Sequence, residues 1–162
     1  MADAAPVHDA TELTHYIEQR YHAQHRRQLP ELADLASKVE RAHAGHADAP
    51  DGLAEILRRM IGELETHMKK EELILFPAMR KGGGPGIEHP IAVMREDHDG
   101  HDHDVAEIRR ITRGPALPED ACRSWTALYA GLDEFMIDLA EHMRLENDVL
   151  FPMFEPDGRA NA

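Results

Sequence analysis

Apolar residues recur at steps of three and four along four long segments of the chain, residues 11–44, 50–80, 88–114 and 118–154. Because an α-helix turns once every 3.6 residues, this spacing places the apolar side chains of each segment on one face of a helix. The connections between the segments are short to moderate in length. The pattern therefore predicts an all-α fold, an antiparallel up-and-down four-helix bundle.

Prolines and the two ends of the chain set the expected boundaries. Pro30 predicts a kink or a restart within the first helix, and Pro77 predicts a distorted last turn in the second, because proline cannot donate a backbone hydrogen bond. Small and polar residues dominate both ends. We expect one domain over residues 11–155, with disordered tails at residues 1–10 and 156–162.

Composition narrows the classes of partner. The 162-residue chain has a formal charge of −13, so it lacks the basic face that nucleic acid or an anionic lipid surface would require. No apolar run is long enough to span a membrane, and Met1 to Ala10 shows no signal peptide. The single Cys122 cannot form a disulfide within the chain. We expect a cytoplasmic protein that binds no nucleic acid and no membrane, and the sequence leaves its oligomeric state open.

An eleven-residue stretch occurs twice. The first copy, HMKKEELILFP, begins at His67, and the second, HMRLENDVLFP, begins at His142, 75 positions later. A second pair of histidines, His22 and His98, keeps nearly the same offset at 76 positions. The chain therefore divides into two similar halves, each with one lone histidine followed by a His-x-x-x-Glu motif.

These motifs point to metal binding. Residues four apart share a helix face, so His67 and Glu71 both reach the bundle interior, as do His142 and Glu146. Each carboxylate can bridge two cations while imidazoles serve as terminal ligands, and this nitrogen and oxygen set suits iron or manganese. The rival interpretation is a structural salt-bridge network, but few Lys or Arg residues lie on the same stripes. We therefore favour a dinuclear metal site.

The sequence leaves alternatives open around this site. His25 and His101 are also 76 positions apart, so periodicity does not choose between them and His22 with His98. Glu63 lies one turn before His67, and Asp97 directly precedes His98. Both are candidates for a catalytic relay of protons or ions, or for hydrogen bonds to ligating histidines. The run DHDGHDHD at 97–104 is interpreted as a polar helix face in preference to a weak extra cation site.

Four segments carry a resemblance to a known family. They are YHAQHRRQLPELADLASKVERAH from Tyr21, ELETHMKKEELILFP from Glu63, PIAVMREDHDGH from Pro90 and LAEHMRLENDVLFP from Leu139. In order and spacing they resemble the hemerythrin-like domain of the di-iron proteins that repair iron–sulfur clusters, the RIC group. The resemblance covers nearly the whole chain.

The resemblance implies a hemerythrin-like bundle that holds two iron ions in an oxo- or hydroxo-bridged di-iron centre. Carried over by position, the ligands are His22, His67, Glu71, His98, His142 and Glu146. The implied function is a response to nitrosative or oxidative stress, in which iron is returned to damaged iron–sulfur client proteins. Reaction with nitric oxide is also implied, and whether it amounts to a reductase-type enzyme activity stays open.

Two departures separate the chain from the oxygen-carrying hemerythrins. Those carriers have a second histidine four positions after the third-helix ligand, where this chain has Asp102, and an aspartate five positions after the last-helix histidine, where it has Asn147. Unless His101 substitutes, fewer ligands leave more open coordination positions, which favours chemistry or iron release over reversible binding of dioxygen. A carrier or sensor of dioxygen or nitric oxide is the alternative, and a helical bundle without metal is the third hypothesis.

Overall fold

The computed structural model describes residues 4–156, and its regular structure within that range consists of helices, with no strand. The helical elements follow one another as α1 (Ala10–Ile17), η1 (Glu18–His22), α2 (Ala23–Ala42), α3 (Leu53–Lys70), η2 (Glu71–Leu75), α4 (Phe76–Arg80), α5 (Glu88–Thr112), α6 (Arg123–Arg144), η3 (Leu145–Leu150) and η4 (Phe151–Met153). Residues 1–3 and 157–162, which belong to the predicted tails, lie outside the described part.

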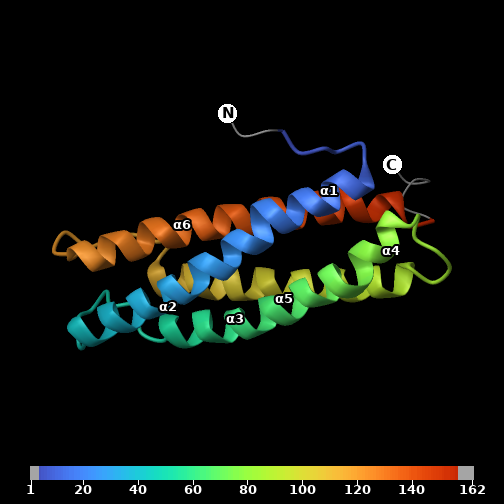
Figure 1. The fold of residues 1–162 in the computed structure, drawn as a ribbon. Helices are drawn as coiled ribbons and strands as arrows, with labels where there is room; N and C mark the ends of the chain where they lie inside the picture. The colour runs from blue at the N-terminus through green and yellow to red at the C-terminus, as the bar shows by residue number, and fades with distance from the viewer. Residues whose placement is uncertain (1–3, 157–162) are drawn as a thin grey trace.

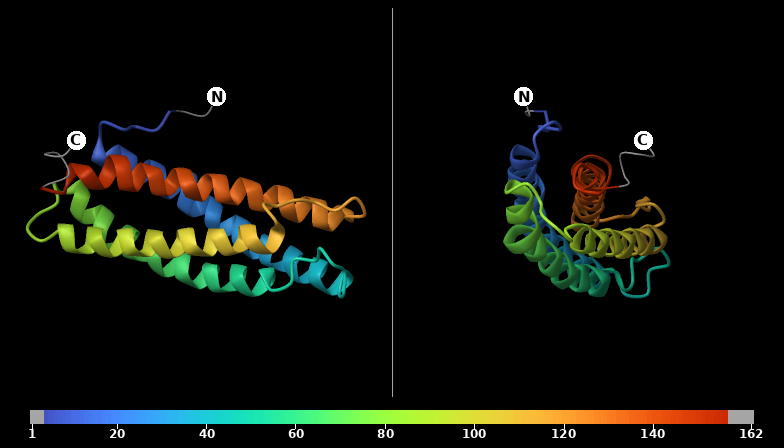
Figure 2. Two further views of the ribbon diagram at one scale, coloured as in Figure 1. Left: turned by 180° about the vertical axis from the view of Figure 1, so that it is seen from behind. Right: turned by 90° about the vertical axis from the view of Figure 1, so that its right-hand side faces the viewer.

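These elements join end to end into four helical rods: α1 to α2, α3 to α4, α5 alone, and α6 to η4. Figure 1 and the two further views in Figure 2 show the rods lying along one another, with successive rods joined at alternate ends of the bundle. The all-α prediction is confirmed. None of the helices within residues 4–156 combines the length and the apolar character that a bilayer-spanning segment requires.

Three of the rods contain a π-helical turn, in which one extra residue widens the helix. Pro77 and Pro152 follow two of these turns, η2 and η3, by two positions. Because proline has no N–H to donate to the carbonyl four residues back, the widened turn accommodates the missing bond. The distortion predicted at Pro77 therefore lies upstream of the proline itself.

The extra residues also move the buried face. Leu75 is buried, whereas Ile74, one position earlier, is 66% exposed. In the last rod, Leu150 is buried, whereas Val149, which the regular spacing would place inside, is only partly buried. A regular 3.6-residue pattern predicts the wrong residue beyond a π turn, because each such turn shifts the face by one position.

The structure decides two points about helix boundaries. The helix does not restart at Pro30, because α2 continues through it with Leu29 and Leu32 on either side buried in the core. The last rod begins at Arg123 instead of near residue 118. The sulfur of Cys122 caps this helix by accepting a hydrogen bond from the backbone N–H of Trp125 at 3.4 Å.

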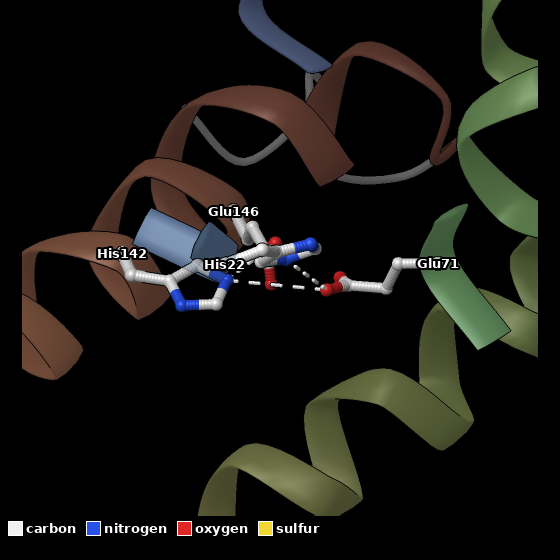
Figure 3. Close-up of side chains that lie close together, drawn as sticks. All are labelled: His22, Glu71, His142 and Glu146. Carbon is white, nitrogen blue, oxygen red and sulfur yellow. Dashed lines mark hydrogen bonds and ion pairs between the residues drawn. The ribbon is translucent and has the colours of Figure 1, made fainter. Parts of the chain in front are cut away.

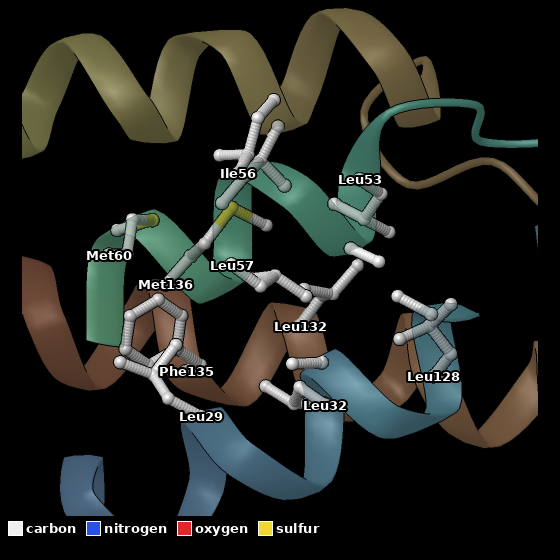
Figure 4. Close-up of a cluster of buried hydrophobic side chains, with 14 of the residues drawn as sticks. Leu29, Leu32, Leu53, Ile56, Leu57, Met60, Leu128, Leu132, Phe135 and Met136 are labelled. Carbon is white, nitrogen blue, oxygen red and sulfur yellow. The ribbon is translucent and has the colours of Figure 1, made fainter. Parts of the chain in front are cut away.

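The apolar side chains form two clusters, one toward each end of the bundle. The larger one includes Leu57 of α3 with Leu132 and Phe135 of α6, all fully buried. Figure 4 shows these side chains meeting Leu29 and Leu32 from α2. The smaller one includes Phe76 and Phe151, and Ala5 and Val7 pack against it from the chain before α1. Along each rod, a set of buried histidine and glutamate residues lies between the two clusters, so apolar packing shields that set from water on both sides.

Candidate metal centre

The structure brings the six candidate ligands together from all four rods. Their side chains are at most 2% exposed, although all six are polar or charged. They are His22 at the end of η1, His67 in α3, Glu71 at the start of η2, His98 in α5, His142 in α6 and Glu146 in η3. Three of the six therefore lie in π turns, which are frequent at functional sites.

The six residues form two overlapping groups of four. One group joins His22, His142, Glu71 and Glu146, and Figure 3 shows these side chains converging. The other joins His67 and His98 to the same two glutamates. Within each group, one candidate ligand atom from every residue lies within 4.8 Å of the others. Because both groups share both carboxylates, the arrangement can hold two cations side by side.

Each glutamate faces one histidine from each group. Oε1 of Glu71 lies 3.2 Å from Nε2 of His22 and 3.3 Å from Nε2 of His67. Glu146 repeats the arrangement, with its oxygens 2.9 Å from Nε2 of His98 and 2.9 Å from Nε2 of His142. Both carboxylates thus occupy the bridging position between the two groups.

The other ring nitrogen of three of these histidines has an oxygen partner. Nδ1–H of His22 donates to Glu72 at 2.7 Å. Nδ1–H of His67 donates to Asp97 at 3.0 Å, and Nδ1–H of His98 donates to the side-chain oxygen of Asn147 at 2.8 Å. A histidine that donates through Nδ1 in this way turns the lone pair of Nε2 toward the glutamates.

His142 differs, because its Nδ1 lies 3.0 Å from Nε2 of another imidazole, that of His25. All four histidines are therefore held from behind, each by a different residue. Such outer partners fix the orientation of histidines that bind metal.

The candidate ligand atoms are arranged so that a positive charge between them would be stabilised. Nε2 of His67 and Nε2 of His98 lie only 3.3 Å apart, and Oε2 of Glu71 is buried without a hydrogen-bond partner. Burial alone lowers the pKa of His22, but hydrogen bonds to Glu71 and Glu72 raise it to about 9. Facing lone pairs and buried carboxylates repel one another unless protons or metal ions lie between them, so these residues fit a pair of metal cations.

The carboxylates respond to the same environment. Burial and the charge of Glu146 raise the pKa of Glu71, but His67, His142 and His22 lower it to about 2. The pKa of Glu146 is likewise held well below its usual value, since the surrounding histidines outweigh the effect of burial. Both side chains are consequently ionised at neutral pH, the form in which a carboxylate binds a metal ion.

The repeated Leu-Phe-Pro ending has a role at this site. Phe76, from the first copy, stacks on His22 with ring centroids 5.8 Å apart and planes 11° apart. Phe151, from the second copy, stacks on His98 with the same separation and angle. Each half of the repeat therefore covers the lone histidine that belongs to its own half.

The remaining candidates lie outside the two groups. His25 contacts His142 from behind, and His101 lies edge-on to His67, with 5.0 Å between ring centroids. The carboxylate of Glu63 lies 3.3 Å from Arg59 on a side chain that is 43% exposed. Of the two relay candidates, only Asp97 contacts a candidate ligand directly.

The sequence interpretation missed two of the outer partners, Glu72 and Asn147. Both residues occupy the fifth position after the histidine that begins a copy of the repeat, His67 in one half and His142 in the other. Each contacts the lone histidine of its own half, His22 or His98. The repeat itself was therefore the signal that could have found them.

The contact of Asp97 gives a testable expectation. Replacing Asp97 by Asn is expected to weaken metal binding at the centre by about 10- to 100-fold, because His67 loses the carboxylate that orients its ring. Metal titration of the purified chain measures this change. Asp99→Asn, an exposed position on the same helix, removes the same charge without touching the site and is expected to bind metal as the wild type does. Equal affinity of both variants would contradict the orienting role.

Comparison with known proteins agrees with this geometry. The profile of the Hemerythrin HHE cation binding domain matches residues 15–154, which include all six candidate ligands. The chain is also similar to bacterial proteins named iron–sulfur cluster repair protein YtfE. It is 50% identical over 137 residues to the protein of Pectobacterium carotovorum subsp. carotovorum, a match that covers 85% of this chain and 62% of the relative.

Two further relatives carry the same name. Identity to the protein of Musicola paradisiaca is 46% over 149 residues, which covers 92% of this chain and 66% of the relative. Identity to the protein of Yersinia pseudotuberculosis is 46% over 142 residues, which covers 88% and 64%. The chain thus spans less than two thirds of the length of these relatives.

Proposed function

The chain belongs to the Hemerythrin HHE cation binding domain family, and from that premise we propose that it is a non-haem di-iron protein that repairs iron–sulfur clusters. In this proposal the clusters are damaged by nitrosative or oxidative stress, and the chain donates iron to them. The proposal includes the antiparallel up-and-down order of a hemerythrin-like bundle and the assignment of two iron ions. It rests on the name shared by the relatives and on the residues of the candidate metal centre.

The observation that carries the proposal is the sharing of Glu71 and Glu146 by two groups of buried histidines. Four imidazole nitrogens and two carboxylates form a donor set that suits iron, and helical bundles hold di-iron centres with inward-facing Glu and His side chains. The bound iron ions would supply open coordination positions for nitric oxide or dioxygen, and iron is also the cargo that a damaged cluster would receive.

The chain's own residues would hold the iron and connect it with solvent. Glu71 and Glu146 stay ionised and offer oxygens to both cation positions. Asp97 accepts the Nδ1 proton of buried His67 and has a side chain that is 29% exposed, so it can exchange protons with water. This contact supports Asp97 as the relay residue. Glu63, which contacts no candidate ligand, has weaker support in that role.

Two considerations favour repair and reaction with nitric oxide over reversible transport of dioxygen. Four histidines, not five, face the carboxylates of the centre. His101, which could have supplied a fifth imidazole, is grouped instead with Glu63 and Asp104. The proposed clients are iron–sulfur proteins, and the proposed location is the cytoplasm.

Metal analysis and a repair assay test this function. The chain purified without oxygen, supplied with Fe²⁺ and then freed of weakly bound metal is expected to retain two iron ions, which Mössbauer spectra would resolve as a coupled pair. Added to an iron–sulfur enzyme damaged by nitric oxide, the iron-loaded chain is expected to restore enzyme activity, whereas the chain stripped of iron by a chelator should not. Iron content well below two per chain, or equal recovery with the stripped chain, would refute the proposal.

A further inference from the structure

The two halves of the repeat differ just outside the candidate metal centre. In the first half, Nε2 of His25 lies 3.0 Å from Nδ1 of His142. The matching residue of the second half, His101, lies beside His67, but Asp97 already holds Nδ1 of that ring. Nε2 of His101 is consequently buried without a hydrogen-bond partner, on a residue that is only 4% exposed.

His101 forms a compact group with two carboxylates. Candidate ligand atoms of His101, Asp104 and Glu63 all lie within 4.8 Å of one another. His101 and Asp104 are three positions apart on α5 and share a helix face, while Glu63 reaches the group from α3. Asp104 is 8% exposed, and its Oδ2 is buried without a hydrogen-bond partner. Buried polar atoms are rarely left unpaired, and this group contains two of them.

The matching group around His25 differs in charge, although Nδ1 of His25 and Oε1 of Gln28 are also buried without a hydrogen-bond partner. There, Gln28 and Asp138 occupy the positions that correspond to Asp104 and Glu63, at offsets of 76 and 75 residues. The side-chain amide of Gln28 donates to the carboxylate of Asp138 at 3.3 Å. Around His101, the carboxylate of Asp104 replaces the amide, so two carboxylates face each other where a donor and an acceptor would otherwise pair.

Arg59 neutralises part of this charge. Its guanidinium lies 2.6 Å from Oδ1 of Asp104 and 3.3 Å from Glu63. The Arg59 side chain is 51% exposed, however, and it leaves both Oδ2 of Asp104 and Nε2 of His101 unpaired. The arginine therefore balances one of the two carboxylate charges but leaves the buried, unpaired atoms without a partner.

A surface pocket gives access to the group. The pocket has a volume of about 670 Å³ and lies between α3 and α5. Its lining includes His101 and Asp104 together with Gly62 and Gly100. A Cβ atom at either glycine would meet nothing within 4 Å, so both glycines leave open space in the wall. A hydrated cation can reach the group from solvent by this route.

We propose that Glu63, His101 and Asp104 form a third cation site, separate from the candidate metal centre, for a divalent first-row metal ion such as Fe²⁺. One imidazole nitrogen and two carboxylate oxygens suit such an ion, and water from the pocket completes its coordination. With three protein ligands and an open side, the third site binds more weakly than the enclosed centre. The buried His101 and Asp104 belong to the run at 97–104, which is therefore more than a polar helix face.

Equilibrium dialysis of the full chain against Fe²⁺ without oxygen tests this site. The wild type is expected to bind three ions, one of them more weakly than the other two. Asp104→Gln introduces the side chain that Gln28 has at the matching position of the other half. This variant is expected to bind the third ion at least tenfold more weakly and to bind the first two ions as the wild type does. Asp102→Gln, at an exposed position on the same helix, removes the same charge and is expected to bind three ions.

Two further variants separate the possible failures. His101→Gln is expected to weaken binding of the third ion to the same extent. If a thermal melt shows that the Asp104→Gln variant is unfolded, His101→Gln takes its place in the test. A double variant, Glu71→Gln with Glu146→Gln, is expected to lose the ions of the centre and to keep one ion whose binding depends on Asp104. The third site can therefore be detected even if the proposed function is wrong. Wild-type binding of only two ions, or three ions retained by both Asp104→Gln and His101→Gln, would overturn the proposal.

Discussion

Replacing Glu146 by Ala is expected to remove most of the metal from the candidate centre. Glu146 belongs to both groups of four and lies 2.9 Å from His98 and 2.9 Å from His142. Its loss takes one carboxylate from both cation positions, so the number of ions held by the centre is expected to fall from two to below one. A ligand present at a thousandfold its Kd stabilises a protein by about 4 kcal/mol per site. The Glu146 variant is expected to lose this stabilisation by metal at the centre. Metal analysis and thermal melts with added metal measure both effects.

Glu134→Ala is the matched control for this change. Glu134 is an exposed residue on α6, the helix that leads into η3, and it belongs to neither group. Its replacement is expected to leave the metal content unchanged and the melting temperature close to that of the wild type. Two ions retained in the centre of the Glu146 variant would show that the shared carboxylate does not bind metal, and the assignment of the centre would fail.

Replacing Phe135 by Ala is expected to destabilise the metal-free chain by about 3–5 kcal/mol, the range for truncating a large aromatic side chain in a core. Phe135 is fully buried in the larger apolar cluster (Figure 4). Its ring also meets the ring of His25 edge-on, with 5.5 Å between centroids. Truncation would leave a cavity directly beneath the residue that supports His142. Urea unfolding followed by circular dichroism measures the loss.

Ile137→Ala provides the comparison for this measurement. Ile137 lies two positions further along α6, and 67% of it is exposed. Its replacement is expected to change the free energy of unfolding by no more than about 0.5 kcal/mol, as is usual for surface positions. If both variants lost the same amount of stability, burial on this helix would not explain the effect of Phe135.

The repeat made four of the candidate ligands predictable from the chain alone. His67 and Glu71 are four residues apart, as are His142 and Glu146, and each pair lies on the apolar stripe of its segment. Any regular helix places such a pair on one face, and the apolar stripe must face inward to be buried. The burial of all four follows from these local rules, which do not depend on how the helices are arranged.

The place of the lone histidines depended on packing between the rods. His22 and His25 lie on the same helix face, and both are fully buried, so the pattern of one helix cannot tell which imidazole reaches the glutamates. Phe76, from another rod, stacks on His22, while His25 pairs with His142. Contacts between residues far apart in the chain made this distinction, and helical periodicity contains no information about them.

The π turns, and the choice between Asp97 and His101 as the partner of His67, also depended on packing between helices. A widened turn shifts every later residue by one position, so that Leu75 packs inside while Ile74 faces solvent. Asp97 and His101 are neighbours on one face of α5. Asp97 is hydrogen-bonded to His67, whereas His101 is grouped with Asp104 and Glu63. Local sequence encodes which side of a helix is buried, whereas the partner of each buried polar atom is set by the other helices packed against it.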